Sequence, residues 1–147
     1  MCRKRIKIIT LFTLILLVVF SILFTLKFKI VVVSGNSMEP TLYNKQILIA
    51  KKQFDDIKYS DIIVLKVEDY GIIIKRVVGM SGDKITSENG LLKINKLVYS
   101  NYHYHFENTI ILDKNELFII GDNYGSSIDS RDFGSVKKEN IIAKVQN

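Results

Sequence analysis

The chain has 147 residues, of which 48% are hydrophobic, and a formal net charge of +6. This length is typical of one domain with or without an anchor, and the single cysteine, Cys2, excludes an intramolecular disulfide. The first 29 residues hold six basic and no acidic side chains, whereas the rest hold 15 of each. The basic charge therefore suits anionic lipid headgroups near the N-terminus and argues against a DNA-binding surface on the remainder.

Residues 8–26 form an uncharged apolar run of 19 residues. A helix of this length is roughly 28 Å long, close to the ~30 Å hydrocarbon thickness of a bilayer. No alanine precedes Ala50, so the small-residue cleavage site of a secretory signal peptide is missing. We interpret the run as an uncleaved transmembrane helix that follows a tail of residues 1–7.

The charges on either side of this run predict its orientation. Four basic residues precede it and two follow it, which favours a cytoplasmic N-terminus. The sequence therefore predicts a single-pass protein of the cytoplasmic membrane, with a cytoplasmic tail and a β-domain of residues 30–147 outside.

Beyond the anchor, apolar residues come in short runs with β-branched members that are typical of strands. Six such runs are expected, over residues 46–52, 61–68, 71–80, 91–99, 116–122 and 140–147. Turn signals occur at residues 68–71, 81–83 and 88–90, the last with an Asn-Gly pair. A helical turn is expected only near 41–44 or 137–140. The predicted fold class is mainly β: an antiparallel coiled sheet or partly open barrel with one N-terminal transmembrane helix.

The polar stretch "SGNSMEPTLYN", residues 34–44, follows the anchor closely. It is either a simple exit turn or the carrier of a nucleophilic serine. A Ser-His-Asp hydrolase needs a histidine, and the sequence has only His103 and His105. No Asp, Glu or Cys cluster with metal-ligand spacing accompanies them, so we interpret both as solvated strand residues.

A serine nucleophile can use a lysine as its base instead. Burial must then lower the lysine pKa from ~10.4 by about 2 units, so that the amine is neutral near pH 7–8. Such a lysine should lie in an apolar run, as Lys75 does in "IIIKRVV". The alternative is a mid-strand lysine whose stem is buried and whose amine reaches solvent.

A third stretch, "GDNYGSSIDSRDFG" at residues 121–134, follows a strongly apolar run. A surface loop would explain its composition, and its acidic residues do not follow the EF-hand spacing of a calcium loop. Asp129 and Arg131 carry opposite charges and are expected to brace the loop. Ser126 and Ser127 would then be held against a neighbouring segment.

Taken together, these three stretches resemble the type I signal peptidases of bacteria, which are membrane-anchored serine proteases with a Ser-Lys dyad. The serine motif S-M-x-P-T is matched at residues 37–41 and the lysine motif K-R-V-x-G at residues 75–79. The third motif, G-D-N-x-x-x-S-x-D-S-R, is matched at residues 121–131. All three occur in the family's order and span most of the chain, which makes the match specific.

The resemblance implies a role for individual residues. Ser37 is expected to be the nucleophile, Lys75 the general base, and Ser127 the residue whose hydroxyl orients the lysine amine. The Ser37 backbone N–H is expected to form the oxyanion hole, where Gly35 supplies no side-chain donor. The expected structural ion pairs are Asp122 with Arg76 and Asp129 with Arg131.

The resemblance also implies a substrate and its partners. Members cleave the signal peptides of exported preproteins at sites with small residues, typically alanine, at the first and third positions before the cut. The expected partners are these signal peptides, the lipid bilayer and the protein-export machinery, without nucleic acid. No metal or organic cofactor is implied. Members fold largely as antiparallel β-domains, in agreement with the strand pattern.

The chain departs from the family pattern at a few positions. Gly35 stands where some members have a serine that donates to the oxyanion. Tyr124 replaces a common arginine, Ser60 a common glycine, and Ser81 a common proline. The segment between the second and third motifs is too short for the large accessory β-domain of some members.

Three alternatives remain open from the sequence. A peptidase dedicated to one secreted or pilin-like substrate would carry the same motifs. Self-cleaving SOS-type repressor domains share the dyad, but they are cytosolic, DNA-linked and lack the proline of the serine motif. A catalytically degenerate, membrane-anchored module that binds exported peptides is the third alternative.

Overall fold

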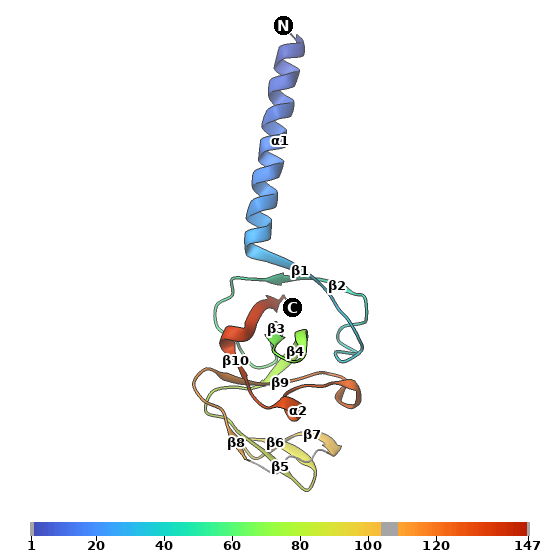
Figure 1. Cartoon of the computed structure of the whole chain (residues 1–147), viewed down its shortest axis with the longest axis vertical. Helices are drawn as coiled ribbons and strands as arrows, with labels where there is room; N and C mark the ends of the chain where they lie inside the picture. The colour runs from blue at the N-terminus through green and yellow to red at the C-terminus, as the bar shows by residue number, and fades with distance from the viewer. Residues whose placement is uncertain (1, 104–108, 147) are drawn as a thin grey trace.

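A computed structural model of the chain describes residues 2–103 and 109–146. Helix α1 (Cys2–Lys27) projects from the folded domain and continues directly into strand β1 (Phe28–Val32) (Figure 1). Residues 5–27 are the helical segment in the described chain that is long and apolar enough to cross a membrane, and its side chains are exposed. Because such a surface is stable only in an apolar environment, α1 is a membrane anchor.

Seven strands of the described chain form one antiparallel sheet in the order β1-β2-β11-β3-β4-β9-β10. The strands after β1 are β2 (Ile47–Lys51), β3 (Ile62–Val67), β4 (Gly71–Gly79), β9 (Glu116–Ile120), β10 (Val136–Lys137) and β11 (Ile141–Val145). The β1–β2 ribbon lies next to the end of α1 (Figure 1). Strand β4 lies well inside the sheet, between β3 and β9.

A second antiparallel sheet has the order β7-β6-β5-β8 and lies at the end of the molecule away from α1 (Figure 1). Its strands are β5 (Lys84–Glu88), β6 (Leu91–Ile94), β7 (Leu97–His103) and β8 (Ile110–Ile111). Short helical turns complete the described chain: η1 (Tyr124–Ser126), α2 (Ser130–Phe133) and η2 (Lys138–Asn140).

The apolar core of the described residues divides into three clusters that follow the sheets. One lies under the β1–β2 ribbon and includes Met38 and Leu42 from the loop that joins these strands. A second packs on the central strands β3, β4 and β9, and the third joins the two sheets through Val78, Ile85 and Phe118. Burial on the central strands covers both faces, so a polar side chain there is removed from water.

The predicted fold class is confirmed: the described chain is mainly antiparallel β with one N-terminal apolar helix, and its larger sheet has two free edges rather than closing into a barrel. The Asn-Gly turn joins β5 to β6 with positive φ at both residues. The prediction of one strand over residues 91–99 was wrong. Asn95 and Lys96 adopt left-handed φ values of 51° and 72° and split the run into β6 and β7.

Other elements were not predicted from the sequence. Strands β1, β5, β8 and β10 were missed, because they are short or merge with the anchor or with polar segments. Helix α2 has four residues and was also missed, whereas η2 lies at the helical turn expected near residues 137–140. Of the two histidines, His103 ends β7 and His105 lies outside the described residues.

A left-handed residue before β3 gives a test of the fold. Ser60 has φ 68°, and its side chain makes no hydrogen bond within the described chain. This conformation costs an L-residue other than glycine ~1–2 kcal/mol. Glycine avoids the cost, but it also raises the conformational entropy of the unfolded chain, which cancels part of the gain in stability. Ser60→Gly should therefore raise the free energy of unfolding by about 0.5–1 kcal/mol, measured as Tm in detergent. The control, Ser81→Gly, changes an exposed serine whose φ is not positive. An equal or larger gain in the control would contradict the explanation.

Candidate active site

Ser37 lies in the loop between β1 and β2. The base of the loop is closed by two hydrogen bonds, from Val33 N to the Gln46 carbonyl (2.9 Å) and from Lys45 N to the Val33 carbonyl (2.8 Å). The next residue, Met38, is 1% exposed in the core under the ribbon, and Met38 accepts a hydrogen bond from Leu42 N. Ser37 itself is half-buried, so the core fixes the loop while the serine hydroxyl stays accessible.

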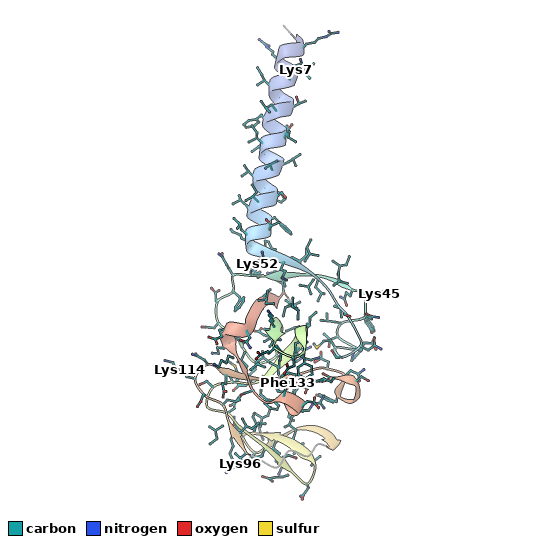
Figure 2. The ribbon with its side chains drawn as sticks, in the orientation of Figure 1. Lys7, Lys45, Lys52, Lys96, Lys114 and Phe133 are labelled. Atoms are coloured by element: carbon teal, nitrogen blue, oxygen red, sulfur yellow. The ribbon has the colours of Figure 1, made fainter. Side chains whose placement is uncertain are left out.

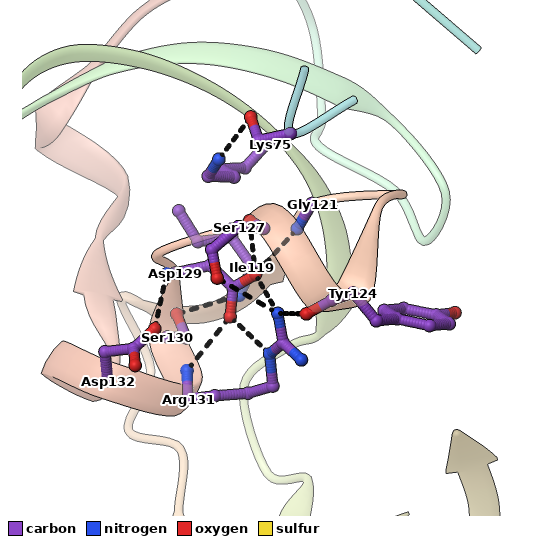
Figure 3. A network of polar contacts seen from close by, with 10 residues as sticks. Lys75, Ile119, Gly121, Tyr124, Ser127, Asp129, Ser130, Arg131 and Asp132 are labelled. Carbon is purple, nitrogen blue, oxygen red and sulfur yellow. Dashed lines mark hydrogen bonds and ion pairs between the residues drawn. The ribbon is translucent and has the colours of Figure 1, made fainter. Parts of the chain in front are cut away.

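Lys75 lies in the middle of β4, where Ile73 and Val77 share its face of the strand. Its side chain is 4% exposed, and its Nζ lies 2.8 Å from Ser37 Oγ in a hydrogen bond that the amine donates (Figure 3). The two residues are 38 positions apart in sequence. Once the amine is neutral, the same distance lets the serine hydroxyl donate to the nitrogen lone pair.

The surroundings of Lys75 lower the pKa of its amine. Burial is the largest cause, because it disfavours the charged ammonium. The negative charge of Asp129 acts in the opposite direction, and the positive charge of Arg131 lowers the pKa further. Burial prevails, so the pKa of Lys75 lies below its ordinary value of 10.5. A lysine in this position can act as a base nearer to neutral pH than a free lysine.

Asp129 is the centre of the polar network below the lysine (Figure 3). Its carboxylate is fully buried and accepts hydrogen bonds from Gly121 N (2.9 Å), the Ser127 hydroxyl (2.7 Å) and the Arg131 guanidinium (2.7 and 2.9 Å). It also caps α2 through a capping box with Asp132. A buried carboxylate needs this many donors to offset its lost hydration. Asp129 thereby ties the 121–134 loop together, from the end of β9 to helix α2.

Ser127 is placed by this network and not by the lysine. Its hydroxyl donates to Asp129 Oδ2, and within the described chain no hydrogen bond joins it to Lys75. The lysine-orienting contact expected from the sequence is therefore not formed in this structure. The Ser127 hydroxyl gives its one proton to the buried carboxylate, and the hydrogen bond that Lys75 donates in the described chain goes to Ser37.

Two residues of the third motif, neither of which was assigned a role from the sequence, approach the serine loop closely. Asn123 N donates to the Ser37 carbonyl (2.9 Å), and Asn123 Nδ2 donates to the Asn36 carbonyl (3.2 Å). At Gly121, an added Cβ would overlap the Ser127 hydroxyl and the Ser37 carbonyl oxygen. The signal for both was their place in the Gly-Asp-Asn motif. The reason for each residue is visible only in the folded structure, where this motif contacts the Ser37 loop.

The expected partners Asp122 and Arg76 form a bidentate ion pair, with distances of 2.7 and 2.6 Å. Arg76 also donates to the Ser60 carbonyl and to Thr41 Oγ1. Burial raises the pKa of Asp122, but hydrogen bonds from Arg76 and Thr41 outweigh it, and the pKa lies below its ordinary value. Arg76, the residue after Lys75, thus joins β4 to the third motif through Asp122 and to the serine loop through Thr41.

One backbone donor near Ser37 has no partner in the described chain. The Ser37 N–H has no acceptor there, whereas the Gly35 N–H donates to Asn44 Oδ1 at 3.1 Å. Gly35 has φ 86° and contributes no side chain. An unpaired backbone N–H on the nucleophile residue is the arrangement that an oxyanion hole requires. The part of the chain that the structure describes has no group of three or more His, Cys, Asp or Glu that could hold a metal ion.

Comparison with known proteins identifies the family. A family model described as "Signal peptidase, peptidase S26" matches residues 5–147. The chain belongs to the signal peptidase family. Membership makes it a peptidase, and helix α1 makes it a membrane-anchored one.

Individual relatives agree with this assignment. The chain is 37% identical over 139 residues to signal peptidase I of Bacillus caldolyticus, covering 78% of this chain and 75% of that protein. It is 29% identical over 137 residues to signal peptidase I V of Bacillus subtilis, covering 78% and 82%. The crystal structure of a signal peptidase I from Enterococcus faecalis has a TM-score of 0.52 and 24% identity, covering 65% of this chain and all of that one. This last similarity supports the fold alone.

The departures from the family pattern have local structural consequences. Ser60 has a left-handed φ at which glycine is favoured, and its carbonyl accepts a hydrogen bond from the Arg76 guanidinium. Tyr124 lies against Arg131, whose guanidinium carbon is 5.8 Å from the ring centroid, and the Tyr124 carbonyl accepts from the same guanidinium. Ser81 is exposed in the turn before Gly82. None of the three interrupts the contact between Ser37 and Lys75.

Removal of the buried Lys75 amine should abolish activity but raise the free energy of unfolding. Because folding lowers the pKa of Lys75, the unfolded chain binds more protons between the folded pKa and 10.5, and stability rises with pH in that window. Lys75→Met should raise the free energy of unfolding at pH 7, within the ~0.5–3 kcal/mol range of single substitutions. The gain should shrink as the pH approaches 10.5, measured as Tm in detergent.

The matched control is Lys66→Met, which removes an exposed lysine from the adjacent strand β3. This variant should show no gain that shrinks with pH. A Lys75→Met protein less stable than wild type at pH 7, or a difference that stays constant with pH, would contradict the electrostatic account.

Proposed function

We propose that this protein is a type I signal peptidase that cleaves signal peptides from exported preproteins by a Ser37–Lys75 dyad. The observation that carries the proposal is the 2.8 Å contact between the Ser37 hydroxyl and a buried lysine amine of lowered pKa. The relatives named signal peptidase I supply the substrate class. The serine and lysine together provide a nucleophile and a base without a histidine.

In the acylation step, neutral Lys75 accepts the proton of Ser37 as the serine oxygen attacks the scissile carbonyl carbon. The carbonyl oxygen becomes an oxyanion that the Ser37 N–H stabilises, a type of contact worth ~10²–10³ in rate. The protonated lysine then gives its proton to the leaving amine, the C–N bond breaks, and an acyl-enzyme remains. Lys75 is neutral again at the end of this step.

In the deacylation step, Lys75 takes a proton from a water molecule that attacks the ester carbonyl. The C–O bond to Ser37 breaks, and the serine oxygen recovers the proton from the lysine. The acid product carries the cleaved end of the signal peptide. In both steps the roles of Asp129 and Arg131 are positional, because they hold together the loop whose charges act on the lysine. We assign Ser127 to the same supporting network through its bond to Asp129.

A groove beside the dyad fits an extended substrate. It has a volume of about 220 Å³ and runs between the end of β1 and the first half of β4, with Ser37 and Lys75 among its lining residues. Residues 72–74 of β4 pair with β3 on one side only, because pairing with β9 begins at Arg76. The free edge can take up a peptide strand by backbone hydrogen bonds. A groove of this size, lined by aliphatic side chains, favours small residues at the substrate positions that point into it.

The anchor places the groove near the membrane surface. Ser37 follows the end of α1 by ten residues, so the scissile bond lies close to the leaflet from which a preprotein emerges. The charge excess before the helix favours a cytoplasmic N-terminus and a catalytic domain outside the cytoplasmic membrane. Exported preproteins would then arrive on the catalytic side, delivered by the export machinery.

The alternatives open from the sequence are less favoured. The apolar helix and the family match over residues 5–147 argue against a cytosolic repressor. The contact between Ser37 and Lys75 argues against a degenerate binding module. A peptidase dedicated to one substrate differs in range and not in chemistry, so a panel of preproteins separates it from a general one.

Ser37→Ala and Lys75→Met should each lower cleavage of a preprotein by at least about 10³-fold, because each removes an indispensable member of a two-residue catalytic unit. The measurement is the initial rate of processing by detergent-purified protein, using several preproteins with alanine at the first and third positions before the cut.

The controls are Ser81→Ala and Lys66→Met, an exposed serine and an exposed lysine away from the groove. Both should cleave at the wild-type rate. Wild-type rates from either dyad variant would refute the assignment of that residue. Cleavage of only one preprotein in the panel would indicate a dedicated peptidase, and a folded wild-type protein that cleaves none would support the binding module.

A further inference from the structure

The joint between helix α1 and the β1–β2 ribbon contains a basic cavity that the peptidase site does not use. It has a volume of about 310 Å³ and is lined by Lys27, Phe28, Lys51 and Gln53. No carboxylate of the described chain lines it. Asp55 and Asp56 lie along a neighbouring depression that shares Lys51. Two lysines therefore line one small cavity that has no acidic residue among its lining.

The joint is held in shape by contacts between helix and ribbon. Lys52 N donates to the Lys27 carbonyl (2.9 Å), and Lys52 Nζ donates to the Thr25 carbonyl (2.7 Å), so a cation caps the C-terminal end of α1. The rings of Phe24 and Phe28 lie 5.1 Å apart, which packs the last helical turn against the first residue of β1. Figure 2 shows Lys52 at this joint.

An apolar face of the ribbon extends from the cavity. The pairs Ile30–Ile49 and Val32–Ile47 follow Phe28–Lys51 in the same register and lie on one face of the two strands. These four aliphatic side chains are 50–69% exposed, whereas the residues between them point into the core. A cluster of this kind is unfavourable in water and marks a contact surface.

The position of the joint relative to the membrane indicates which molecules contact it. The membrane-spanning segment ends at Lys27, so the cavity lies where the hydrocarbon ends and the lipid headgroups begin. Lysines at this depth place their amines among lipid phosphates while their stems remain in apolar surroundings. The apolar ribbon face continues from the same point, as in proteins that rest in the membrane interface.

We propose that this cavity binds the phosphate headgroup of an anionic phospholipid, with the apolar face of the β1–β2 ribbon resting in the same leaflet. Lys27 and Lys51 provide the charge that selects an anionic over a zwitterionic lipid. The bound lipid fixes the height of the ribbon, and with it the Ser37 loop, above the membrane. The proposal rests on the membrane anchor and not on the peptidase chemistry.

The test is lipid retention by the full-length protein in a zwitterionic detergent. Native mass spectrometry gives the ratio of bound phosphatidylglycerol to bound phosphatidylcholine, with the same acyl chains in both lipids. Wild type should prefer phosphatidylglycerol. Since a lysine near a membrane surface contributes about 1 kcal/mol, or about fivefold, the Lys27→Gln/Lys51→Gln variant should lower the ratio about 25-fold.

Two further variants complete the experiment. Lys96→Gln/Lys114→Gln makes the same charge change on the domain away from α1 (Figure 2) and should retain the wild-type ratio. Lys27→Arg/Lys51→Arg keeps both charges and should retain it as well. An unchanged ratio in the Lys27→Gln/Lys51→Gln variant, equal retention of both lipids by wild type, or displacement of the lipid by millimolar inorganic phosphate would overturn the proposal.

Discussion

The candidate site depends on one constraint: an amine removed from water must be neutral, or it must be compensated. Lys75 is 4% exposed and meets Ser37 at 2.8 Å, and its pKa is lowered chiefly by burial. A carboxylate free to pair with it would reverse this effect. The structure satisfies the nearby Asp129 with Arg131, Gly121 and Ser127, so that its charge only partly opposes the burial of the amine. The pairing of Asp129 therefore bears on the electrostatics of Lys75 as well as on loop geometry.

The same network explains why three distant segments of the chain must meet. Asn123 holds the carbonyls of the serine loop, and Arg76 joins the strand that carries Lys75 to the start of the third motif through Asp122. Each of these bonds restricts a loop rather than a side chain alone. Rigid support of this kind keeps reacting groups within a few tenths of an ångström, which catalysis by positioned groups requires.

The sequence predicted those features that follow from local pattern. The apolar residues Ile73 and Val77, two positions to either side of Lys75, indicated burial, and the Asn89-Gly90 pair indicated a tight hairpin, because each signal depends on residues close by in the sequence. The split between β6 and β7 was missed because Asn95-Lys96 carries no glycine, although both residues adopt left-handed φ. Whether Ser127 bonds to Lys75 or to Asp129 depends on distances between segments that are far apart in the sequence. Residue spacing in a single sequence does not give these distances. The close approach at Gly121 was inaccessible for the same reason.

The most direct measurement of the central claim is a titration of the Lys75 amine itself. Protein labelled with ¹³C at lysine Cε gives one resonance per lysine in detergent micelles, and the Lys75 signal is the one absent from a Lys75→Arg protein. The account predicts that this signal titrates with a midpoint below 10.5, the ordinary value for lysine. A midpoint at or above 10.5 would show that the amine stays charged where a base is needed, and would contradict the account.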